Sequence, residues 1–398
     1  MERLRVTWMR LPESVRWCVA AFLVARVLFW LWGGLVMTLI PISPQGPFFQ
    51  PAVPAPSGWL GWALAPWNRW DVFWYTRIAV QGYGIPDGRG AFAPLFPLLI
   101  AVLGRVLGGQ YLMAAFVVSD ACCLGSLILL YEVAQRDVQR GRRAVVALLI
   151  YPFAFFLFIP YTESLLLLLT LTAFLAARSG RWWLVGVCCA LAVLTKTLAV
   201  VLLVPMAWEL WKRRDTDALW KGLWLTLPVL AFMGWLVVRD LFFNVQAGPS
   251  FASPYGLLTP FLSSDFAVAW NNAVLSWPWN SLIAAVLAPF RLWPHLIATT
   301  AVIDLATLLG VLFLAILVFR LPRQSYGLYV LAVIVMSLIM IVKVVPLQDA
   351  PRRWLLAFPL FTAAAAYVPR RWERPLIYLS LLLQVLLSAL FVKWAVVA

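Results

Sequence analysis

The chain has 398 residues, of which 64% are hydrophobic and only 12% are charged, and its mean hydropathy is +0.91. A soluble fold cannot bury so much apolar surface, so lipid must form part of the solvent. The apolar runs are continuous, whereas a transmembrane β-barrel is built from short segments of alternating hydrophobicity. The composition therefore predicts an all-α, polytopic integral membrane protein and excludes a soluble domain.

The net charge of +15 arises from 31 Lys and Arg against 16 acidic residues. The basic residues cluster in short loops between apolar runs, as the positive-inside rule and an affinity for anionic membrane lipid predict. Nucleic-acid binding would instead place them along one face, so no nucleic-acid partner is expected. The five cysteines lie within apolar runs, and His295 is the single histidine, which argues against a zinc site, a haem or a Ser-His-Asp triad. We expect no metal and no cofactor.

The chain opens on a basic segment, residues 1–16, followed by an apolar run from Cys18 to about Pro41. This run is too long for the core of a signal peptide and lacks a cleavage site, which predicts an uncleaved first span with a cytoplasmic N-terminus. Residues 42–90 then form a first extracytoplasmic loop. Its tryptophan-rich middle is expected to lie partly in the membrane interface, where WDVFWYTRIAV can form a short helix that GYGIPDGRG ends.

Ten further apolar segments follow, at Phe92–Leu107, Tyr111–Ala134, Ala144–Ile159, Ser164–Ala177, Trp182–Trp208, Gly222–Val238, Ile297–Phe319, Tyr326–Val345, Trp354–Tyr367 and Leu376–Val396. They predict one transmembrane domain over residues 1–398, with about ten or eleven spans and a second large external loop at residues 240–296. Two features conflict with simple crossings. The basic segment 136–143 would lie outside, and Ser164–Ala177 is short for a span. We therefore expect broken or partly spanning helices between residues 92 and 208.

Asp71 is the first functional candidate, because a carboxylate among aromatic rings at a membrane surface is costly unless a partner or ligand satisfies it. It could cap the loop helix or pair with Arg69 or Arg77. Alternatively, it could act as a general base, or position an acceptor hydroxyl, in a partly desolvated pocket.

Charged residues near or within apolar runs are the other candidates. Glu163 follows Pro160 and could either begin a helix or face the same pocket as Asp71. Lys196 lies between two threonines inside an apolar run, where it could snorkel or bind an anion. Arg352 and Arg353, at the external end of a span, could anchor that span at the interface or hold a lipid phosphate bidentately.

An external carboxylate combined with cations at membrane depth suits an enzyme with a lipid-phosphate substrate. The carboxylate would receive a hydroxyl proton, and the cations would stabilise the phosphate leaving group. The sequence has no P-loop and no glycine-rich phosphate cradle, so a nucleotide-sugar or ATP substrate is not expected.

Three pieces of the chain resemble the PIG-V-type mannosyltransferases and their bacterial relatives. WDVFWYTRIAVQGYG with FAPLFPLL resembles the family's first-loop signature of a Trp-Asp pair, an aromatic stretch, Ile-Ala, Gly-Tyr and Phe-x-Pro-Leu-x-Pro. YPFAFFLFIPYTESLLLLL and the later LTKTLAV resemble its Tyr-Thr/Ser-Glu-Ser-Leu and Ala-x-x-Thr-Arg-x-x-Gly blocks. PRRWLLAFPLF resembles its Pro-Arg-Tyr-x-Leu-x-x-Phe-Pro-Leu-Phe segment. Together with the segments between them, these pieces cover most of the chain in the family's order.

The resemblance also has departures. Lys196 stands where the relatives usually have Arg, Trp354 stands where Tyr is usual, and Leu198-Ala199 replaces an ending with Gly. The segment FFNVQAGPSF lacks the Trp of the family's Ala-Gln-x-x-Trp. These departures bear on the acceptor more than on the fold.

The resemblance implies a GT-C-type glycosyltransferase that moves a sugar, expectedly mannose, with inversion from a polyprenyl-phosphate donor to a lipid or lipid-linked acceptor, as the family's eukaryotic members do in building glycolipid anchors. The reaction would take place without metal on the extracytoplasmic face. The short loops between the apolar runs indicate a bacterial cytoplasmic membrane. Asp71 would be the catalytic carboxylate. The expected substrate-binding residues are Trp70, Trp74, Tyr75, Arg77, Tyr161, Glu163, Lys196, Arg352 and Arg353.

Two other functions fit the same residues. A transporter or flippase for lipid-linked sugars would also need cations and carboxylates in its helices, although it would place them near the membrane midplane. A non-catalytic subunit of a glycosyltransferase complex would keep the fold and tolerate the loss of Asp71.

Overall fold

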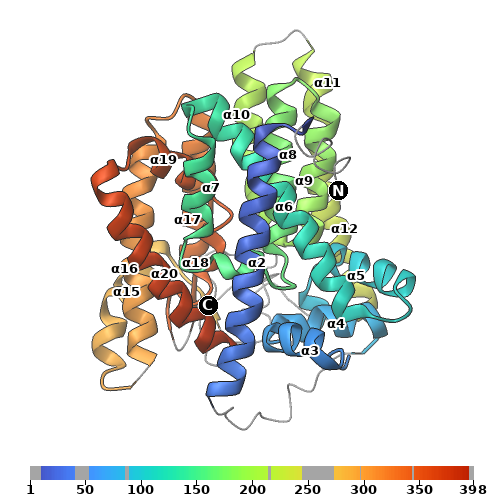
Figure 1. Cartoon of the computed structure of the whole chain (residues 1–398). Coiled ribbons are helices and arrows are strands. Elements are labelled where there is room, and N and C mark those ends of the chain that lie inside the picture. Colours follow the sequence, from blue (N-terminus) through green and yellow to red (C-terminus); the bar gives the residue numbers. More distant parts are fainter. Residues whose placement is uncertain are drawn as a thin grey trace.

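The computed structural model describes residues 10–40, 53–85, 89–213, 217–243, 273–295, 297–342 and 345–393. Most of the second expected external loop, part of the first and the first nine residues lie outside these ranges. The described part is almost entirely helical (Figure 1). Two three-residue strands, β1 (Ala273–Leu275) and β2 (Met340–Val342), pair antiparallel with Val274 opposite Ile341. The expected all-α, polytopic architecture is confirmed.

The first half of the structure contains, in chain order, α2 (Glu13–Leu39), α3 (Gly58–Leu64), η2 (Ala65–Trp67), α4 (Asp71–Gln81), η3 (Arg89–Ala91), α5 (Leu95–Val106), α6 (Tyr111–Val138), α7 (Gly141–Leu149), η4 (Ala154–Leu157), α8 (Glu163–Arg178), α9 (Trp182–Thr195), η5 (Thr197–Leu202) and α10 (Leu203–Arg213). The second half contains α11 (Ala218–Leu223), α12 (Thr226–Phe243), α15 (Pro278–Arg291), α16 (Ile297–Val318), α17 (Gln324–Leu338), α18 (Ala350–Trp354), α19 (Pro359–Tyr367) and α20 (Arg370–Val392), with β1 before α15 and β2 after α17.

Within the described ranges, five helical stretches are long and apolar enough to cross a bilayer: α2, α6, α11 with α12, α16 and α20. Helices α5, α9 and α17 are apolar but shorter. The long stretches are fewer than the ten or eleven full spans expected, because other expected segments are interrupted. Residues 144–159 divide into α7 and η4, and residues 182–208 divide into α9, η5 and α10. The broken helices expected between residues 92 and 208 are therefore confirmed.

The basic segment 136–143 lies at the same end of the molecule as the start of α2. Arg142 donates a 2.6 Å hydrogen bond to Glu13, and Arg143 lies 3.3 Å from Glu373 at the start of α20. A simple count of crossings would place this segment and the start of α2 at opposite ends, and the structure places them at the same end. Helix α5, with 12 residues, is too short to cross as a straight helix, whereas α6, with 28, is long enough.

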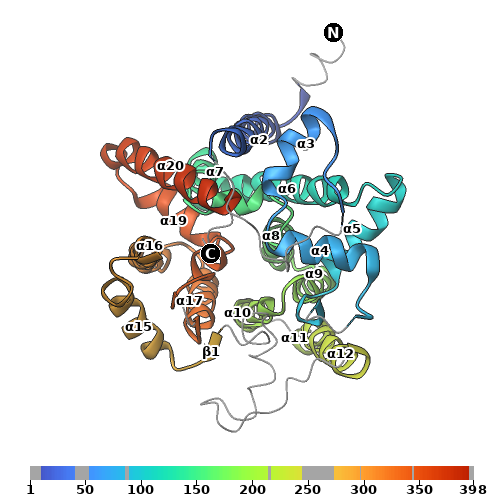
Figure 2. The ribbon, with the colours of Figure 1, turned by 90° about the horizontal axis from the view of Figure 1, so that it is seen from below.

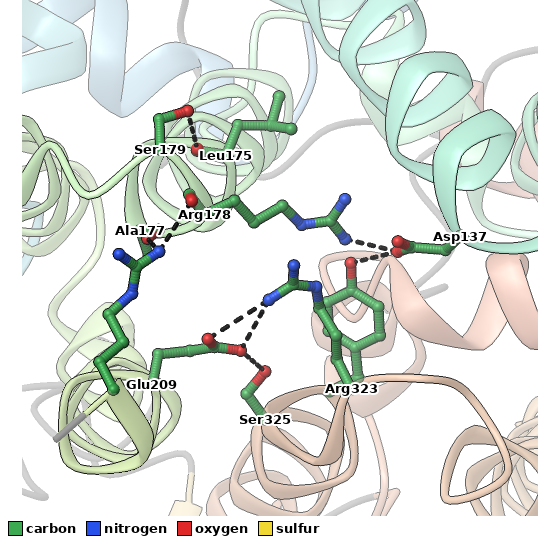
Figure 3. A network of polar contacts seen from close by, with 10 residues as sticks. Asp137, Leu175, Ala177, Arg178, Ser179, Glu209, Arg323 and Ser325 are labelled. Carbon is green, nitrogen blue, oxygen red and sulfur yellow. Dashed lines mark hydrogen bonds and ion pairs between the residues drawn. The ribbon is translucent and has the colours of Figure 1, made fainter.

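A network of ion pairs ties four helices together at this basic end (Figure 3). Asp137 of α6 accepts hydrogen bonds from Arg178 of α8 and from the Tyr326 hydroxyl of α17. Glu209 of α10 lies 3.3 Å from Arg323, just before α17. These contacts join the ends of α6, α8, α10 and α17 at one end of the bundle.

The loop helices α3 and α4 lie at the opposite end, with α3 beside the C-terminal half of α2 and α4 beside α5 (Figures 1 and 2). Two adjacent glycines of α2 allow this approach. A Cβ atom at Gly33 would lie 2.6 Å from the Trp67 ring, and one at Gly34 would lie 2.1 Å from the Trp62 ring. As expected, α4 ends at a glycine, Gly82, which adopts φ +70°. The segment with Asp71 is therefore packed onto the bundle.

Candidate functional site

Helix α4 begins at Asp71 and follows a strained residue. Trp70 has φ 53° and ψ −119°, a backbone conformation that a bulky side chain rarely adopts. Such strain costs on the order of 1–3 kcal/mol and persists only where the surroundings hold it in place. The backbone N–H of Asp71 donates a 3.2 Å hydrogen bond to the Tyr161 hydroxyl. The turn thus points the Asp71 carboxylate toward the interior.

That carboxylate belongs to a buried group of charged side chains, which we call the ionic centre: Asp71, Glu163, Lys196, Asp349 and Arg352. Each nitrogen of the Arg352 guanidinium faces a different carboxylate. Nη1 lies 3.1 Å from Asp71 Oδ2, Nε lies 3.2 Å from Glu163 Oε1, and Nη2 lies 3.5 Å from Asp349 Oδ1. Lys196 Nζ lies 3.2 Å from the same Glu163 oxygen. The centre joins residues that are up to 281 positions apart.

Helix breaks place Glu163 and Lys196 in contact. Pro152 and Pro160 disfavour helix in the segment between α7 and α8, so that α8 starts at Glu163, whose side chain is 1% exposed. Lys196 is extended (φ −155°, ψ 122°) between α9 and η5. The lysine therefore lies at an interruption of the apolar run and not within a continuous span, and it forms an ion pair in place of snorkelling.

Residues 150–162 contain no α-helix and only the short 3₁₀ helix η4, so some of their backbone carbonyls are bonded by side chains instead. Arg26 of α2 donates a hydrogen bond to the Phe158 carbonyl and pairs with Asp120 of α6. Ser164 Oγ donates a 2.7 Å bond to the Leu157 carbonyl. Gln384 of α20 donates hydrogen bonds to the carbonyls of Leu149 and Tyr151 at the start of this stretch. These bonds make an irregular backbone possible inside a membrane protein.

Aromatic rings enclose the ionic centre. The guanidinium carbon of Arg352 lies 5.4 Å from the Phe156 ring centroid and 5.2 Å from that of Tyr161. Tyr75 of α4 meets Tyr161 edge-on with their centroids 6.2 Å apart. The rings lower the local dielectric, which strengthens the ion pairs and raises the cost of leaving any charge unpaired.

The structure brings several of the expected site residues together and places others nearby. Asp71, Glu163, Lys196 and Arg352 form ion pairs, with Tyr75 and Tyr161 against them. Trp74 stacks on Phe92 with a centroid separation of 5.8 Å and an interplanar angle of 19°, and Arg77 lies over the Trp74 ring. Trp70 supplies the strained turn. Arg353 is adjacent to Arg352 on α18 and is 3% exposed.

The sequence suggested Arg69 or Arg77 as a partner of Asp71. In the structure its partner is Arg352. Arg69 donates instead to the carbonyls of Val392 and Ala65. Arg352 itself is buried against carboxylates, so it does not act as an interfacial anchor. Asp349 was missed from the sequence as a site residue. Its signal was an acid three residues before Arg352, in a segment interpreted only as an external turn.

Burial and the positive charge of Arg352 shift the pKa of Asp71 in opposite directions. Burial raises the pKa of the Asp71 carboxyl to about 6, although Arg352 lowers it, and the Asp349 charge adds to the increase. Three carboxylates share two cations in the ionic centre, so one negative charge is left over when all are ionised. With its pKa raised in this way, the Asp71 carboxylate can accept a proton near neutral pH. Among the described residues, no group of His, Cys, Asp or Glu is arranged to hold a metal ion.

Fold and site together define a polytopic helical membrane protein with a buried ionic centre at the end of the bundle opposite its basic loops. Comparison with models of known families and with curated proteins found no match. Among solved structures, the chain is similar to ArnT from Cupriavidus metallidurans bound to undecaprenyl phosphate, with a TM-score of 0.44 and 16% identity, over 87% of this chain and 59% of that one. It is also similar to the Archaeoglobus fulgidus oligosaccharyltransferase in complex with zinc and sulfate, with a TM-score of 0.37 and 14% identity, over 94% and 53%.

The chain thus spans little more than half the length of either protein. Similarity at this level assigns no activity to the chain, and membership of the PIG-V-type family stays a prediction from the sequence motifs. The function is therefore inferred from the chain's own residues.

Proposed function

We propose that the chain is an integral-membrane glycosyltransferase that takes a sugar from a polyprenyl-phosphate donor, and that this sugar is mannose. One observation carries the proposal. Asp71, in a motif that resembles the first-loop signature of such enzymes, is a buried carboxylate whose pKa is raised to about 6 and which is held by Arg352. A base with these properties suits removal of a proton from a hydroxyl group near neutral pH.

In the proposed reaction, Asp71 accepts the proton of the acceptor hydroxyl as that oxygen bonds to the sugar's anomeric carbon. The bond from this carbon to the donor phosphate breaks, and its electron pair leaves with the polyprenyl phosphate. Attack from the face opposite the leaving group inverts the anomeric configuration. Lys196 and Arg353 would stabilise the charge on the phosphate. Arg352 would chiefly hold Asp71, since each of its nitrogens already faces a carboxylate.

We further propose that the reaction occurs on the extracytoplasmic face of a bacterial cytoplasmic membrane and that the acceptor is a lipid or lipid-linked molecule. Glu163 and Arg178 lie at opposite ends of α8, and Arg178 belongs to the basic end of the bundle. By the positive-inside rule that end is cytoplasmic, so the ionic centre would face outward. Both substrates would reach it from the surrounding lipid.

Transfer by the purified full chain from several labelled donors tests the proposal. Polyprenyl-phosphate mannose, polyprenyl-phosphate glucose and a nucleotide-linked mannose would each be supplied with a lipid extract from bacterial membranes. We expect labelled lipid from the mannose polyprenyl donor alone. Transfer from the nucleotide donor would refute the lipid-phosphate part, and transfer from the glucose donor would refute mannose.

The same preparation distinguishes the two alternative functions. A transporter or flippase would move the labelled polyprenyl donor across liposome membranes without forming a new glycoside. A non-catalytic subunit would do neither on its own. Either result would refute the proposed enzyme.

A further inference from the structure

Asp349 occupies a backbone conformation that favours glycine. It lies just before α18 with φ 71° and ψ −18°, in the left-handed region, and its side chain does not cap that helix. Asp and Asn enter this region more readily than other residues, yet a glycine would do so without steric cost. A non-glycine residue in a strained conformation is often retained for its side chain. The Asp349 side chain is buried and faces Arg352.

The position of that carboxylate determines how Arg352 can be oriented. The guanidinium is planar, so contacts at Nε and Nη2 fix the direction of Nη1. Glu163 Oε1 lies 3.2 Å from Nε and Asp349 Oδ1 lies 3.5 Å from Nη2 as ion-pair contacts, whereas Nη1 donates a 3.1 Å hydrogen bond to Asp71. Without Asp349, Nη2 would lose its carboxylate and the charge of the guanidinium would be shared between two carboxylates in place of three.

We propose that Asp349 is a positioning residue, which orients Arg352 against Asp71 and draws part of the arginine's charge away from it. The inference rests on the proposed function, in which Asp71 is the base of the transfer reaction. Asp349 would thereby keep Asp71 able to take up a proton, because an aspartate paired with an undivided arginine binds protons weakly.

Among the residues that the structure describes, four charged groups act on Asp71. Arg352 and Asp349 come from the segment at α18, Glu163 from the start of α8 and Lys196 from the break after α9. Burial raises the pKa of Asp71, Arg352 and Lys196 lower it, and Asp349 and Glu163 raise it. Asp349 is the acid among them that shares a short segment with Arg352.

Two substitutions separate the charge of Asp349 from its backbone conformation. Asp349→Asn keeps the size and the tolerance for the left-handed region but removes the charge. Asp349→Gly relieves the backbone and removes the side chain. If the Asn variant does not fold, the Gly variant still reports on the lost carboxylate.

The readout is the protonation of Asp71 itself, followed by infrared difference spectroscopy of the purified full chain as a function of pH. The band of the protonated Asp71 carboxyl is identified by its loss in Asp71→Asn. In wild type we expect its midpoint at about pH 6. In both Asp349 variants we expect the midpoint to fall by about one pH unit. An unchanged midpoint in the folded variants would overturn the proposal.

This titration does not depend on catalysis, so it separates the inference from the proposed function. If wild type transfers no sugar but the midpoint still moves, the proposed function fails and the coupling of Asp349 to Asp71 stands. If wild type is active and the midpoint is unmoved, the proposed function stands and the role of Asp349 is refuted.

Discussion

Arg352 is the residue on which the site depends, because its planar guanidinium meets three carboxylates at once. A lysine supplies the same charge from a single ammonium group and cannot reproduce this geometry. We expect Arg352→Lys to fold but to lose at least about 10-fold in transfer rate, while Arg352→Met, which leaves buried carboxylates unpaired, loses about 3–5 kcal/mol of stability. Transfer assays and thermal unfolding in detergent measure the two effects. A fully active lysine variant would contradict this role.

The pKa of Asp71 sets a pH dependence for transfer. A base must be ionised to accept a proton, so the rate should fall as the pH drops through about 6 and should level off above it. The effect on stability has the opposite sign. Between the ordinary pKa of an aspartate and about 6, the folded chain binds the Asp71 proton more tightly than the unfolded chain, so this group lowers stability as the pH rises. A pH–rate profile at saturating donor tests the first expectation, which a flat profile down to pH 4 would contradict.

Much of the site could be predicted from local sequence, but its connections could not. Asp71, Glu163, Lys196 and Arg352 each stand out because a charge near or within an apolar run is costly. Nothing local indicates which of them pair, since the contacts join residues from four distant parts of the chain. Asp349 was missed because an acid in an external turn carries no such cost, and its importance depends on a backbone turn and on the orientation of Arg352.

At the scale of elements, the break between α7 and α8 depends on Arg26, which bonds the Phe158 carbonyl and pairs with Asp120. Removing one partner of a buried ion pair leaves an unpaired charge. We expect Arg26→Met to lower the free energy of unfolding by about 3 kcal/mol, and to lower the midpoint of thermal unfolding accordingly.

The exposed pair of Arg142 and Glu13 provides a matched control, since both side chains are more than half exposed. Arg142→Met should leave the midpoint of thermal unfolding close to that of wild type, because solvent screens an exposed ion pair. The double variant Arg26→Met with Asp120→Leu should recover part of the loss. If Arg26→Met and Arg142→Met lowered the midpoint of thermal unfolding equally, the pair of Arg26 and Asp120 would not stabilise the break between α7 and α8.

The sequence pattern predicted most helices but not where they are interrupted. The length of the apolar runs indicated the long helices α2, α6, α16 and α20, and the GYGIPDGRG segment was correctly expected to end α4. The break at Lys196 has no proline or glycine to announce it. There, the ion pair with Glu163 competes with helix continuity, and such a tertiary contact cannot be read from local propensity.

At the scale of the whole molecule, the two ends of the bundle differ in charge, which predicts an orientation. Ser57, before α3, and Ser179, after α8, are exposed at opposite ends, and the five native cysteines are buried. A membrane-impermeant maleimide should label Ser57→Cys in intact bacterial cells and should label Ser179→Cys only after permeabilisation. The reverse pattern would place the ionic centre in the cytoplasm.

The central claim is that Asp71 performs the chemistry, and a comparison of two equivalent substitutions tests it most directly. Asp137 is a matched control: its side chain is 9% exposed and pairs with Arg178, whereas that of Asp71 is 12% exposed and pairs with Arg352. Asp71→Asn and Asp137→Asn would be assayed with polyprenyl-phosphate mannose alongside wild type. We predict that Asp71→Asn lowers transfer at least about 100-fold while folded Asp137→Asn stays within about 3-fold of wild type, because it lies far from the ionic centre. Equal turnover by Asp71→Asn and wild type would contradict the account.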